Sequence, residues 1–254
     1  MNKTALITGA SSGFGYEFVK LFAKDNYNLI LVARNIKKLE EIKREFSGVE
    51  ITVIQKDLTL SGAVKELYGK IKEKGLNIDV LVNNAGFGLL GEFDKLDIEK
   101  QTNMIQLNVA VLTELTHYAL REMKQRKSGK ILNVASTAAF QPGPLMAVYF
   151  ATKAYVLSFS EALVEELKDT GITVTTLCPG ASKTNFGKIA SVEKTKMFEK
   201  AMEADIVAQL GYNALMRGQR VIITGTLNKI GAYAAKFLPR SLAAKVAKLS
   251  AGEK

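Results

Sequence analysis

Short runs of aliphatic and β-branched residues alternate with longer amphipathic stretches along most of the chain, and this alternation constrains the fold more than any other feature. Runs such as LILVA and DVLV are apolar without interruption. Parallel strands that helices cover on both faces have this pattern. The expected strands are Lys3–Thr8, Asn28–Ala33, Glu50–Gln55, Ile78–Val82, Gly129–Ala135, Ile172–Cys178 and Arg220–Ile223.

Between these runs, apolar residues recur at three- and four-residue spacing, which predicts helices. The expected helices lie at about 14–25, 36–47, 60–75, 97–127, 148–169 and 203–217. Strands that alternate with helices form right-handed βαβ units and a doubly wound sheet. Because no Pro/Gly/Ser-rich linker and no internal repeat divides the sequence, we expect a single α/β domain.

The composition argues against several other classes of protein. Of the 254 residues, 47% are hydrophobic and 24% are charged, which is typical of a globular chain. One cysteine, Cys178, and one histidine, His117, cannot form an intramolecular disulfide or a Cys/His zinc cage, so we expect no metal. A single cysteine fits a reducing compartment, and the N-terminus shows no export signal, so we expect a cytoplasmic protein.

The excess of basic residues leaves several partners open. The chain holds 35 Lys and Arg against 25 Asp and Glu, a formal charge of +10. Such a balance can serve nucleic acid, an anionic membrane surface or an acidic ligand. The sequence has neither a basic stripe interleaved with stacking aromatics nor a recognition motif, so we expect no nucleic-acid partner.

A glycine-rich turn, Thr8–Gly15, follows the first strand and opens the first helix. A backbone without Cβ atoms can approach a pyrophosphate closely, and a helix N-terminus offers free N–H groups to its charge. The alternative is a tight strand–helix turn that binds nothing. The candidate dinucleotide contacts in this turn are Gly9, Ser11, Ser12, Gly13, Phe14 and Gly15.

The end of the second strand indicates which dinucleotide would bind. A site for NADH places an acid there to accept the ribose 2′-OH, whereas an arginine suits a 2′-phosphate. The sequence reads Val32-Ala33-Arg34-Asn35, with no acid. The Arg34 guanidinium can pair with a phosphate through two hydrogen bonds, so NADPH is favoured over NADH. The alternative is a surface arginine that leads into the next helix.

Tyr149 and Lys153 stand four residues apart at the start of a predicted helix, so they share one helix face. A nearby cation favours the phenolate and brings the pKa of a tyrosine toward neutrality, where proton transfer is most efficient. Ser136 ends the fifth strand, at the edge of the sheet where ligands bind, and its hydroxyl can hold a carbonyl oxygen. Alone, a YxxxK pair is weak evidence, because Tyr and Lys often share a helix face by chance.

In combination, these motifs resemble the short-chain dehydrogenase/reductase family, in the branch with a TGxxxGxG turn and a YxxxK motif. The resemblance covers residues 1–225 and implies a Rossmann fold there, with a parallel seven-stranded sheet. The motifs occur in the family's order: Thr8–Gly15, Asn83-Asn84-Ala85-Gly86, Ser136 with Tyr149 and Lys153, and Pro179-Gly180 with Thr184.

The resemblance also adds candidate site residues. Asn108 matches the helix asparagine of the family's catalytic tetrad, beside Ser136, Tyr149 and Lys153, and Asn83 matches a brace between the central strands. Cofactor contacts are implied for Asp57 and Leu58 at the adenine, for Asn84, Ala85 and Gly86, and for Pro179, Gly180 and Thr184 at the nicotinamide.

What the resemblance implies is an NADP-dependent oxidoreductase that interconverts a carbonyl and a secondary alcohol on a small molecule. Tyr149 would donate the proton and Ser136 would orient the substrate. Lys153 would bind the nicotinamide ribose and lower the pKa of Tyr149, while Asn108 would hold a water that relays protons. A fairly apolar substrate is expected, such as a 3-oxoacyl or steroid-like ketone.

The family commonly forms dimers or tetramers, so the resemblance implies a homodimer or homotetramer through the helices at 97–127 and 148–169. The alternative function is a regulatory protein that binds NADP(H) without turnover. A sensor has no need of a proton donor, and the complete set of Asn108, Ser136, Tyr149 and Lys153 argues against it.

Two segments lie outside these motifs. From 186 to 203 the helical pattern loosens, which predicts a mobile segment over the substrate site or, alternatively, a solvated surface helix. Residues 226–254 form a basic C-terminal extension, and residues 224–254 hold six basic residues against one acid, which is half of the formal +10. Leu242, Val246 and Leu249 recur at helical spacing there. We expect this stripe to dock on the body or on a second subunit rather than on an anionic membrane.

Overall fold

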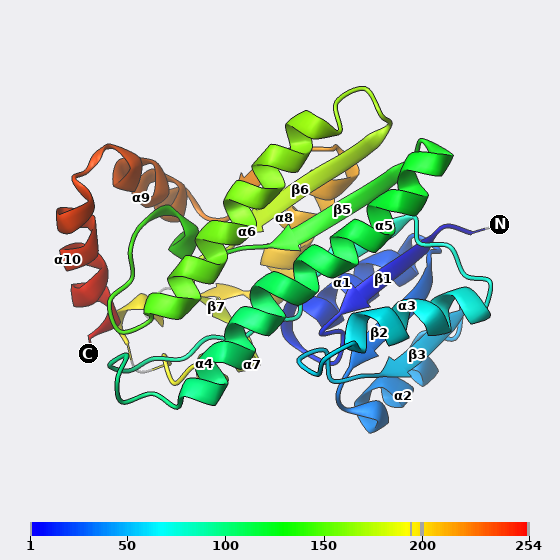
Figure 1. The fold of residues 1–254 in the computed structure, drawn as a ribbon, viewed down its shortest axis with the longest axis horizontal. Coiled ribbons are helices and arrows are strands. Elements are labelled where there is room, and N and C mark those ends of the chain that lie inside the picture. The colour runs from blue at the N-terminus through cyan, green and yellow to red at the C-terminus, as the bar shows by residue number, and fades with distance from the viewer. Residues whose placement is uncertain (1, 194, 199–200, 253–254) are drawn as a thin grey trace.

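A parallel seven-stranded sheet forms the centre of the protein in a computed structural model, which describes residues 2–193, 195–198 and 201–252 (Figure 1). The strand order is β3-β2-β1-β4-β5-β6-β9, and all neighbours in it are parallel. This confirms the doubly wound Rossmann-type fold. The strands are β1 (Thr4–Thr8), β2 (Asn28–Ala33), β3 (Ile51–Gln55), β4 (Val80–Asn83), β5 (Gly129–Val134), β6 (Ile172–Cys178) and β9 (Val221–Ile223), with a separate pair β7 (Ser182–Lys183) and β8 (Met202–Glu203).

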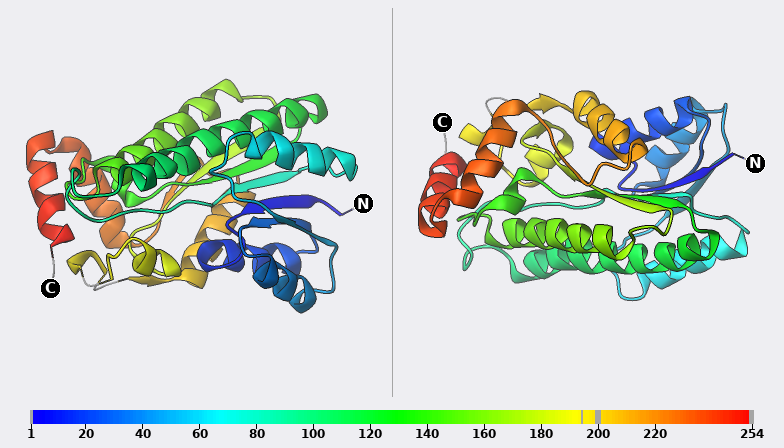
Figure 2. Two further views of the ribbon diagram at one scale, coloured as in Figure 1. Left: turned by 60° about the horizontal axis from the view of Figure 1, so that its bottom comes forward. Right: turned by 90° about the horizontal axis from the view of Figure 1, so that it is seen from above.

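Helices cover both faces of the sheet (Figure 2). One face carries α1 (Gly13–Lys24), α2 (Ile36–Glu45) and α8 (Ala204–Met216), and the other carries α3 (Ala63–Glu73), α5 (Leu112–Arg126) and α6 (Ala147–Glu166). The helix expected at 97–127 is continuous and consists of α4 (Ile98–Ile105), a π-helical stretch at Gln106–Val111, and α5.

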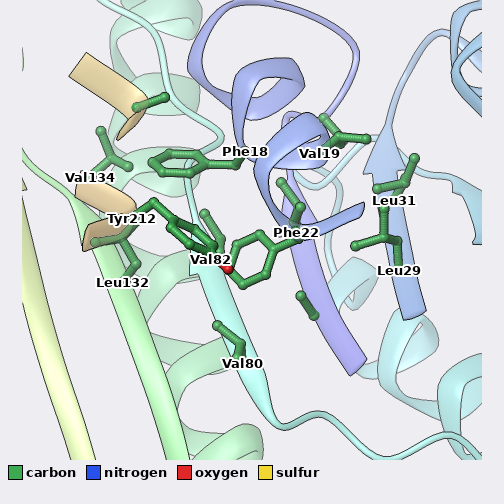
Figure 3. Close-up of a cluster of buried hydrophobic side chains, with 14 of the residues drawn as sticks. Phe18, Val19, Phe22, Leu29, Leu31, Val80, Val82, Leu132, Val134 and Tyr212 are labelled. Carbon is green, nitrogen blue, oxygen red and sulfur yellow. The ribbon is translucent and has the colours of Figure 1, made fainter. Parts of the chain in front are cut away.

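Aromatic side chains fix α1 and α8 to the sheet (Figure 3). Phe18 and Phe22 lie four residues apart, so they share one face of α1, and both are fully buried. The ring of Phe22 meets that of Tyr212 from α8 edge-on, with centroids 4.9 Å apart. Full burial of one such ring stabilises the fold by roughly 2–3 kcal/mol. These contacts fix α1 against the sheet, so that its N-terminus lies at the carboxyl end of β1.

A buried polar network joins the two central strands to the helices behind them. The Asn83 side-chain amide on β4 donates to Thr116 Oγ1 at 3.0 Å and to Asn133 Oδ1 on β5 at 2.9 Å. Asn133 in turn donates to Ser160 Oγ on α6 at 2.9 Å. Asn83 therefore braces the sheet, as the resemblance implies, and the network positions α6, which carries Tyr149 and Lys153.

The observed elements differ from the expected ones chiefly at their ends and beyond β9. The helix expected at 60–75 begins only at Ala63, because Gly62 takes a left-handed conformation with φ of 73° before the first turn. A helix that the sequence analysis missed, α9 (Thr226–Phe237), follows β9 directly. The helix expected after Pro239 is present as α10 (Arg240–Ala251).

The C-terminal helices α9 and α10 lie together at one end of the molecule, beyond the carboxyl ends of the strands (Figure 1). The stripe expected on α10 does not dock on the body, because Leu242, Val246 and Leu249 are 45%, 51% and 73% exposed, and its docking on a second subunit stays a prediction. Instead α10 contacts the body through small side chains, because Ala243 and Ala251 are buried. Alanines allow a closer approach of the helix than leucines would.

Two further findings concern membranes and metals. None of the helices in the described part of the chain is both long and apolar enough to cross a bilayer. Among the same residues, His, Cys, Asp and Glu side chains do not gather in groups of three or more that could hold a metal ion.

Replacing the bracing asparagine should destabilise the fold. In Asn83→Ala, Asn133 Oδ1 and Thr116 Oγ1 lose a buried donor, and we expect the free energy of unfolding to fall by about 2–3 kcal/mol. Urea unfolding of the two proteins measures this difference. Asn213→Ala, at an exposed position on α8, is the control and should cost less than about 0.5 kcal/mol. Equal losses in the two variants would contradict the bracing role.

Candidate active site

A cavity of about 1130 Å³ lies at the carboxyl ends of the strands. Residues that follow β1 and β4 line it, at the point where the strand order reverses. In doubly wound sheets this crevice is where ligands bind. From there the cavity extends to the end of β2 in one direction and to α9 and α10 in the other.

The glycine-rich turn forms one wall of the cavity, and its glycines are required by close contacts. Gly9 has a φ of 66°, and a Cβ atom there would lie 2.8 Å from Asn84 Nδ2. A Cβ atom on Gly15 would lie 2.2 Å from the Gly9 carbonyl oxygen. Of the residues predicted to contact a dinucleotide, Gly9, Ser11, Ser12, Gly13 and Phe14 line the cavity, at the N-terminus of α1.

Gly15 does not line the cavity, in contrast to the other predicted residues of this turn. It lies buried in the first turn of α1, against the backbone of Gly9. Its part in the site is therefore to let the helix start close to the strand.

Hydrogen bonds fasten this turn to the end of β4. Thr8 Oγ1 accepts from the backbone N–H groups of Asn84 and Ala85, each at 3.0 Å. The Asn84 side chain donates to the Thr8 carbonyl at 2.8 Å. The predicted contact residues Asn84, Ala85 and Gly86 line the cavity beside the turn. The two segments form one rigid floor.

The far end of the cavity is lined by charged residues after β2 and β3. Arg34 is exposed at the end of β2 and lines the cavity, together with Asp57 and Leu58, and their cofactor contacts stay a prediction. Lys56, which the sequence analysis did not single out, lines the same end. Partial burial acts to raise the pKa of Asp57, but two hydrogen bonds from Thr59 and the Arg34 charge outweigh it and hold this pKa below its usual value. Because Lys56 forms an ion pair with Glu66, Arg34 is the exposed cation at this end of the cavity, beside the ionised Asp57.

The structure brings together Tyr149, Lys153 and Ser136 at the centre of the cavity. All three side chains are buried, and the Lys153 ammonium lies 5.8 Å from the centroid of the Tyr149 ring. Lys153 Nζ donates to the Val134 carbonyl at 2.8 Å. Ser136 Oγ accepts from the Ala138 N–H at 3.1 Å, and this bond holds the hydroxyl at the end of β5.

Burial, and not Lys153, sets the direction of the Tyr149 pKa, so the expectation that the cation would lower it is wrong for this structure. Burial raises the pKa of Tyr149 to about 12, against a smaller lowering from the hydrogen bond with Ser136. Burial also lowers the pKa of Lys153 to about 8. At neutral pH the phenol therefore keeps its proton and the lysine is still mainly charged. This is the protonation state of an acid ready to donate.

Asn108 lies behind the cavity and does not line it. In the π-helical stretch, its side-chain amide donates to the Phe87 carbonyl at 3.0 Å and to Thr152 Oγ1 at 3.1 Å, and its oxygen accepts from the Phe87 N–H at 3.2 Å. Asn108 thus fixes the loop after β4 to α6. The water relay implied for it stays a prediction.

The loop after β6 forms another wall of the cavity and meets the glycine-rich turn, since a Cβ atom on Gly13 would lie 3.3 Å from Thr184 Cβ. The predicted residues Pro179, Gly180 and Thr184 line the cavity, and Thr184 caps α7 (Asn185–Ile189) by accepting from the Phe186 N–H at 3.2 Å. Asn228 from α9 also lines the cavity and packs on Gly180, where a Cβ atom would lie 2.2 Å from Asn228 Nδ2. No motif in the sequence pointed to Asn228, since α9 itself was not predicted.

The end of the cavity beyond Tyr149 is mostly apolar. The ring of Phe186 on α7 lies 5.3 Å from that of Tyr149, centroid to centroid. Of the segment 186–203, residues 194, 199 and 200 lie outside the described part, and its mobility stays a prediction. The apolar side chains that line this end include Phe87, Leu89, Met146, Phe150, Phe186, Val192, Phe198, Leu238 and Val246.

Comparisons with known proteins agree with this geometry. A family model described as short chain dehydrogenase matches residues 3–195. The chain is 34% identical over 219 residues to human 17-beta-hydroxysteroid dehydrogenase type 3, covering 84% of this chain and 68% of that protein. It is 35% identical over 221 residues to a very-long-chain 3-oxoacyl-CoA reductase-like protein of Arabidopsis thaliana, and the match covers 82% of this chain and 70% of that protein. A solved short-chain dehydrogenase from Sphingobium yanoikuyae in complex with NADPH superposes with a TM-score of 0.81 at 30% identity. The superposition covers 91% of this chain and 92% of that one.

Proposed function

The chain belongs to the short-chain dehydrogenase family, whose members are oxidoreductases, and on this basis we propose that it is an NADPH-dependent reductase that interconverts a carbonyl and a secondary alcohol. One observation carries the proposal. The buried hydroxyl of Tyr149 stands beside Ser136 in the same cavity as a glycine-rich turn at a helix N-terminus. A proton donor and a dinucleotide cradle therefore share one crevice.

The residues of the cradle fit NADPH. The glycines of the turn leave its backbone accessible, and the N-terminus of α1 offers N–H groups to a pyrophosphate. Arg34 supplies the cation that a 2′-phosphate needs, where an NADH site would carry an acid, and Lys56, which is paired with Glu66, lies at the same end of the cavity. The NADPH complex of the related structure supports the same choice.

In the proposed reaction, bound NADPH supplies the hydride that reduces the carbonyl carbon. Ser136 holds the carbonyl oxygen by a hydrogen bond, at the end of β5. Tyr149 donates its phenolic proton to that oxygen as negative charge develops on it, which is general acid catalysis. The Lys153 ammonium, fixed by the Val134 carbonyl, then stabilises the tyrosinate that is left behind.

The lining of the cavity supports a fairly apolar substrate. Aromatic and aliphatic side chains surround the space beyond Tyr149, and such a surface favours a substrate that loses little hydration on binding. Two of the related proteins are named for a hydroxysteroid and a 3-oxoacyl-CoA. A steroid-like or 3-oxoacyl ketone is therefore the class of substrate that we propose.

Turnover tests the proposed function directly. NADPH consumption should be followed with a panel of ketones that includes 3-oxoacyl thioesters, steroids and small polar ketones. We expect turnover that favours the apolar members. Tight NADPH binding without turnover on any member would instead indicate a regulatory protein.

The role of Tyr149 as proton donor can be tested by removing its hydroxyl group. In Tyr149→Phe, the phenolic proton is lost while the ring remains, so kcat should fall by at least about a hundredfold. The Kd for NADPH, measured by fluorescence, should stay close to that of the wild type. Tyr155→Phe on the same helix is the matched control, because its exposed hydroxyl contacts Thr113 and not the cavity. Full activity in Tyr149→Phe would contradict the assignment of Tyr149 as the proton donor.

The second prediction concerns the choice of cofactor. In Arg34→Asp, the cation at the end of β2 is replaced by a charge that repels a 2′-phosphate. The loss of a charge-assisted hydrogen bond should weaken NADPH binding by about tenfold to a hundredfold, with NADH binding unchanged or improved. Titrations with both cofactors measure this ratio. The exposed Arg44→Asp on α2 serves as the control, and an unchanged ratio in Arg34→Asp would refute the role of Arg34.

The third prediction concerns pH. Because the pKa of Lys153 lies at about 8 and that of Tyr149 at about 12, raising the pH removes the lysine charge first. For reduction, kcat/KM should be constant near neutrality and should fall above about pH 8. In Lys153→Arg, the guanidinium stays charged, so any remaining activity should lose this decline. A wild-type profile that stays flat to about pH 10 would contradict the assignment.

A further inference from the structure

The outer face of α9 carries large apolar side chains that the rest of the described chain leaves exposed to solvent. Ile230, Tyr233 and Phe237 follow one another at three- and four-residue spacing, so they share a helix face. They are 61%, 48% and 88% exposed. The inner face, with the buried Ala232, contacts the body.

The outer face of α10 continues this apolar surface after the turn at Pro239. Leu242, Val246 and Leu249 share a side of that helix, and each is roughly half exposed or more. The segment from α9 to α10, with Leu238 between the two helices, holds eight of the sixteen exposed large hydrophobic side chains in the described part of the chain. Isolated exposed leucines need no explanation, but a contiguous group marks an interaction site.

Basic side chains flank the apolar ones on both helices, and residues 226–252 contain no Asp or Glu. We call this surface the cap surface. It consists of Ile230, Tyr233, Phe237, Leu242 and Leu249, with Val246, which is half exposed and also lines the cavity, and with Lys229, Lys236, Arg240, Lys245 and Lys248.

We propose that the cap surface binds the surface of an anionic phospholipid bilayer. Helices with an apolar side and flanking lysines lie in the interface of such a membrane, with the apolar groups among the acyl chains and the cations at the headgroups. The basic residues match the negative charge of the headgroups. A second copy docked face to face through the same surface would instead bring two basic surfaces together without an acid from residues 226–252 on either side.

The position of the cap surface suggests what membrane binding would do for the enzyme, namely deliver its substrate. This step rests on the proposed function. The inner sides of α9 and α10 line the apolar end of the cavity, through residues such as Ala235, Leu238 and Ala247. A bilayer against the outer sides therefore lies next to the substrate end of the site. An apolar ketone dissolved in the membrane would reach Tyr149 from that end.

Vesicle sedimentation tests the proposal with the full chain. The probes are vesicles of phosphatidylcholine alone and of phosphatidylcholine with phosphatidylglycerol. We expect binding to the mixed vesicles that weakens with salt, and little binding to the neutral ones. In Ile230→Ser/Phe237→Ser/Leu249→Ser, the affinity should fall by at least about tenfold. None of these three residues lines the cavity, so activity on a water-soluble ketone should persist and reports the proposed function separately.

Charge variants provide a second, independent arm. Lys245→Glu/Lys248→Glu should weaken binding to the mixed vesicles by at least about tenfold. The matched control, Lys43→Glu/Lys168→Glu, makes the same change in net charge at exposed positions on α2 and after α6, and should bind like the wild type. Ile206→Ser on α8 is the apolar control.

Three results would overturn the proposal. They are equal binding to neutral and anionic vesicles, no binding to either, and equal losses in the variants and their controls. If light scattering shows a dimer that Phe237→Ser dissociates, while vesicles bind nothing, the cap surface is an interface between copies of this chain instead.

Discussion

The reversal of strand order between β1 and β4 is the constraint on which the site depends. The chain leaves these two neighbouring strands toward opposite faces of the sheet, so a crevice opens between the segments that follow them. The crevice stays narrow because Thr8 and Asn84 hydrogen-bond across it and because Gly9 has no side chain. A pyrophosphate cradle and the ends of β4 and β5 are thereby held within one cavity.

The chemistry of the site follows from burial within that cavity. Both Tyr149 and Lys153 are shielded from water, and burial disfavours the charged form of each. It therefore raises the pKa of Tyr149 and lowers that of Lys153. The lysine remains charged near neutrality although its ammonium is buried, and the Val134 carbonyl compensates part of its lost hydration. The Asn83 network that orders α6 therefore serves the protonation states as well as the fold.

The sequence allowed the prediction of those parts of the site that rest on local geometry. The turn from Gly9 to Phe14, the helix pair of Tyr149 and Lys153, and Ser136 at a strand end are each defined within a few residues, and the structure brings them together. The direction of the Tyr149 pKa was beyond reach, because it depends on burial by distant segments. Asn228 was missed for a similar reason, since only the packing of α9 carries it to the cavity, whereas Lys56, directly before the predicted Asp57, was missed because no motif singles it out. Gly15 and Asn108 were assigned by motif, and their positions behind the cavity could not be read from it.

The C-terminal helices show where hydrophobic periodicity stops being informative. It located a stripe at Leu242, Val246 and Leu249 correctly, but it cannot tell a face that meets protein from one that meets something else. In the structure the small residues Ala232, Ala243 and Ala251 are buried against the body, and large ones such as Phe237, Leu242 and Leu249 are exposed. A helix that needed only to close the cavity would gain more by burying its leucines, at roughly 2 kcal/mol each. The inverted arrangement, with basic residues beside the exposed leucines, is what a surface for an anionic bilayer requires.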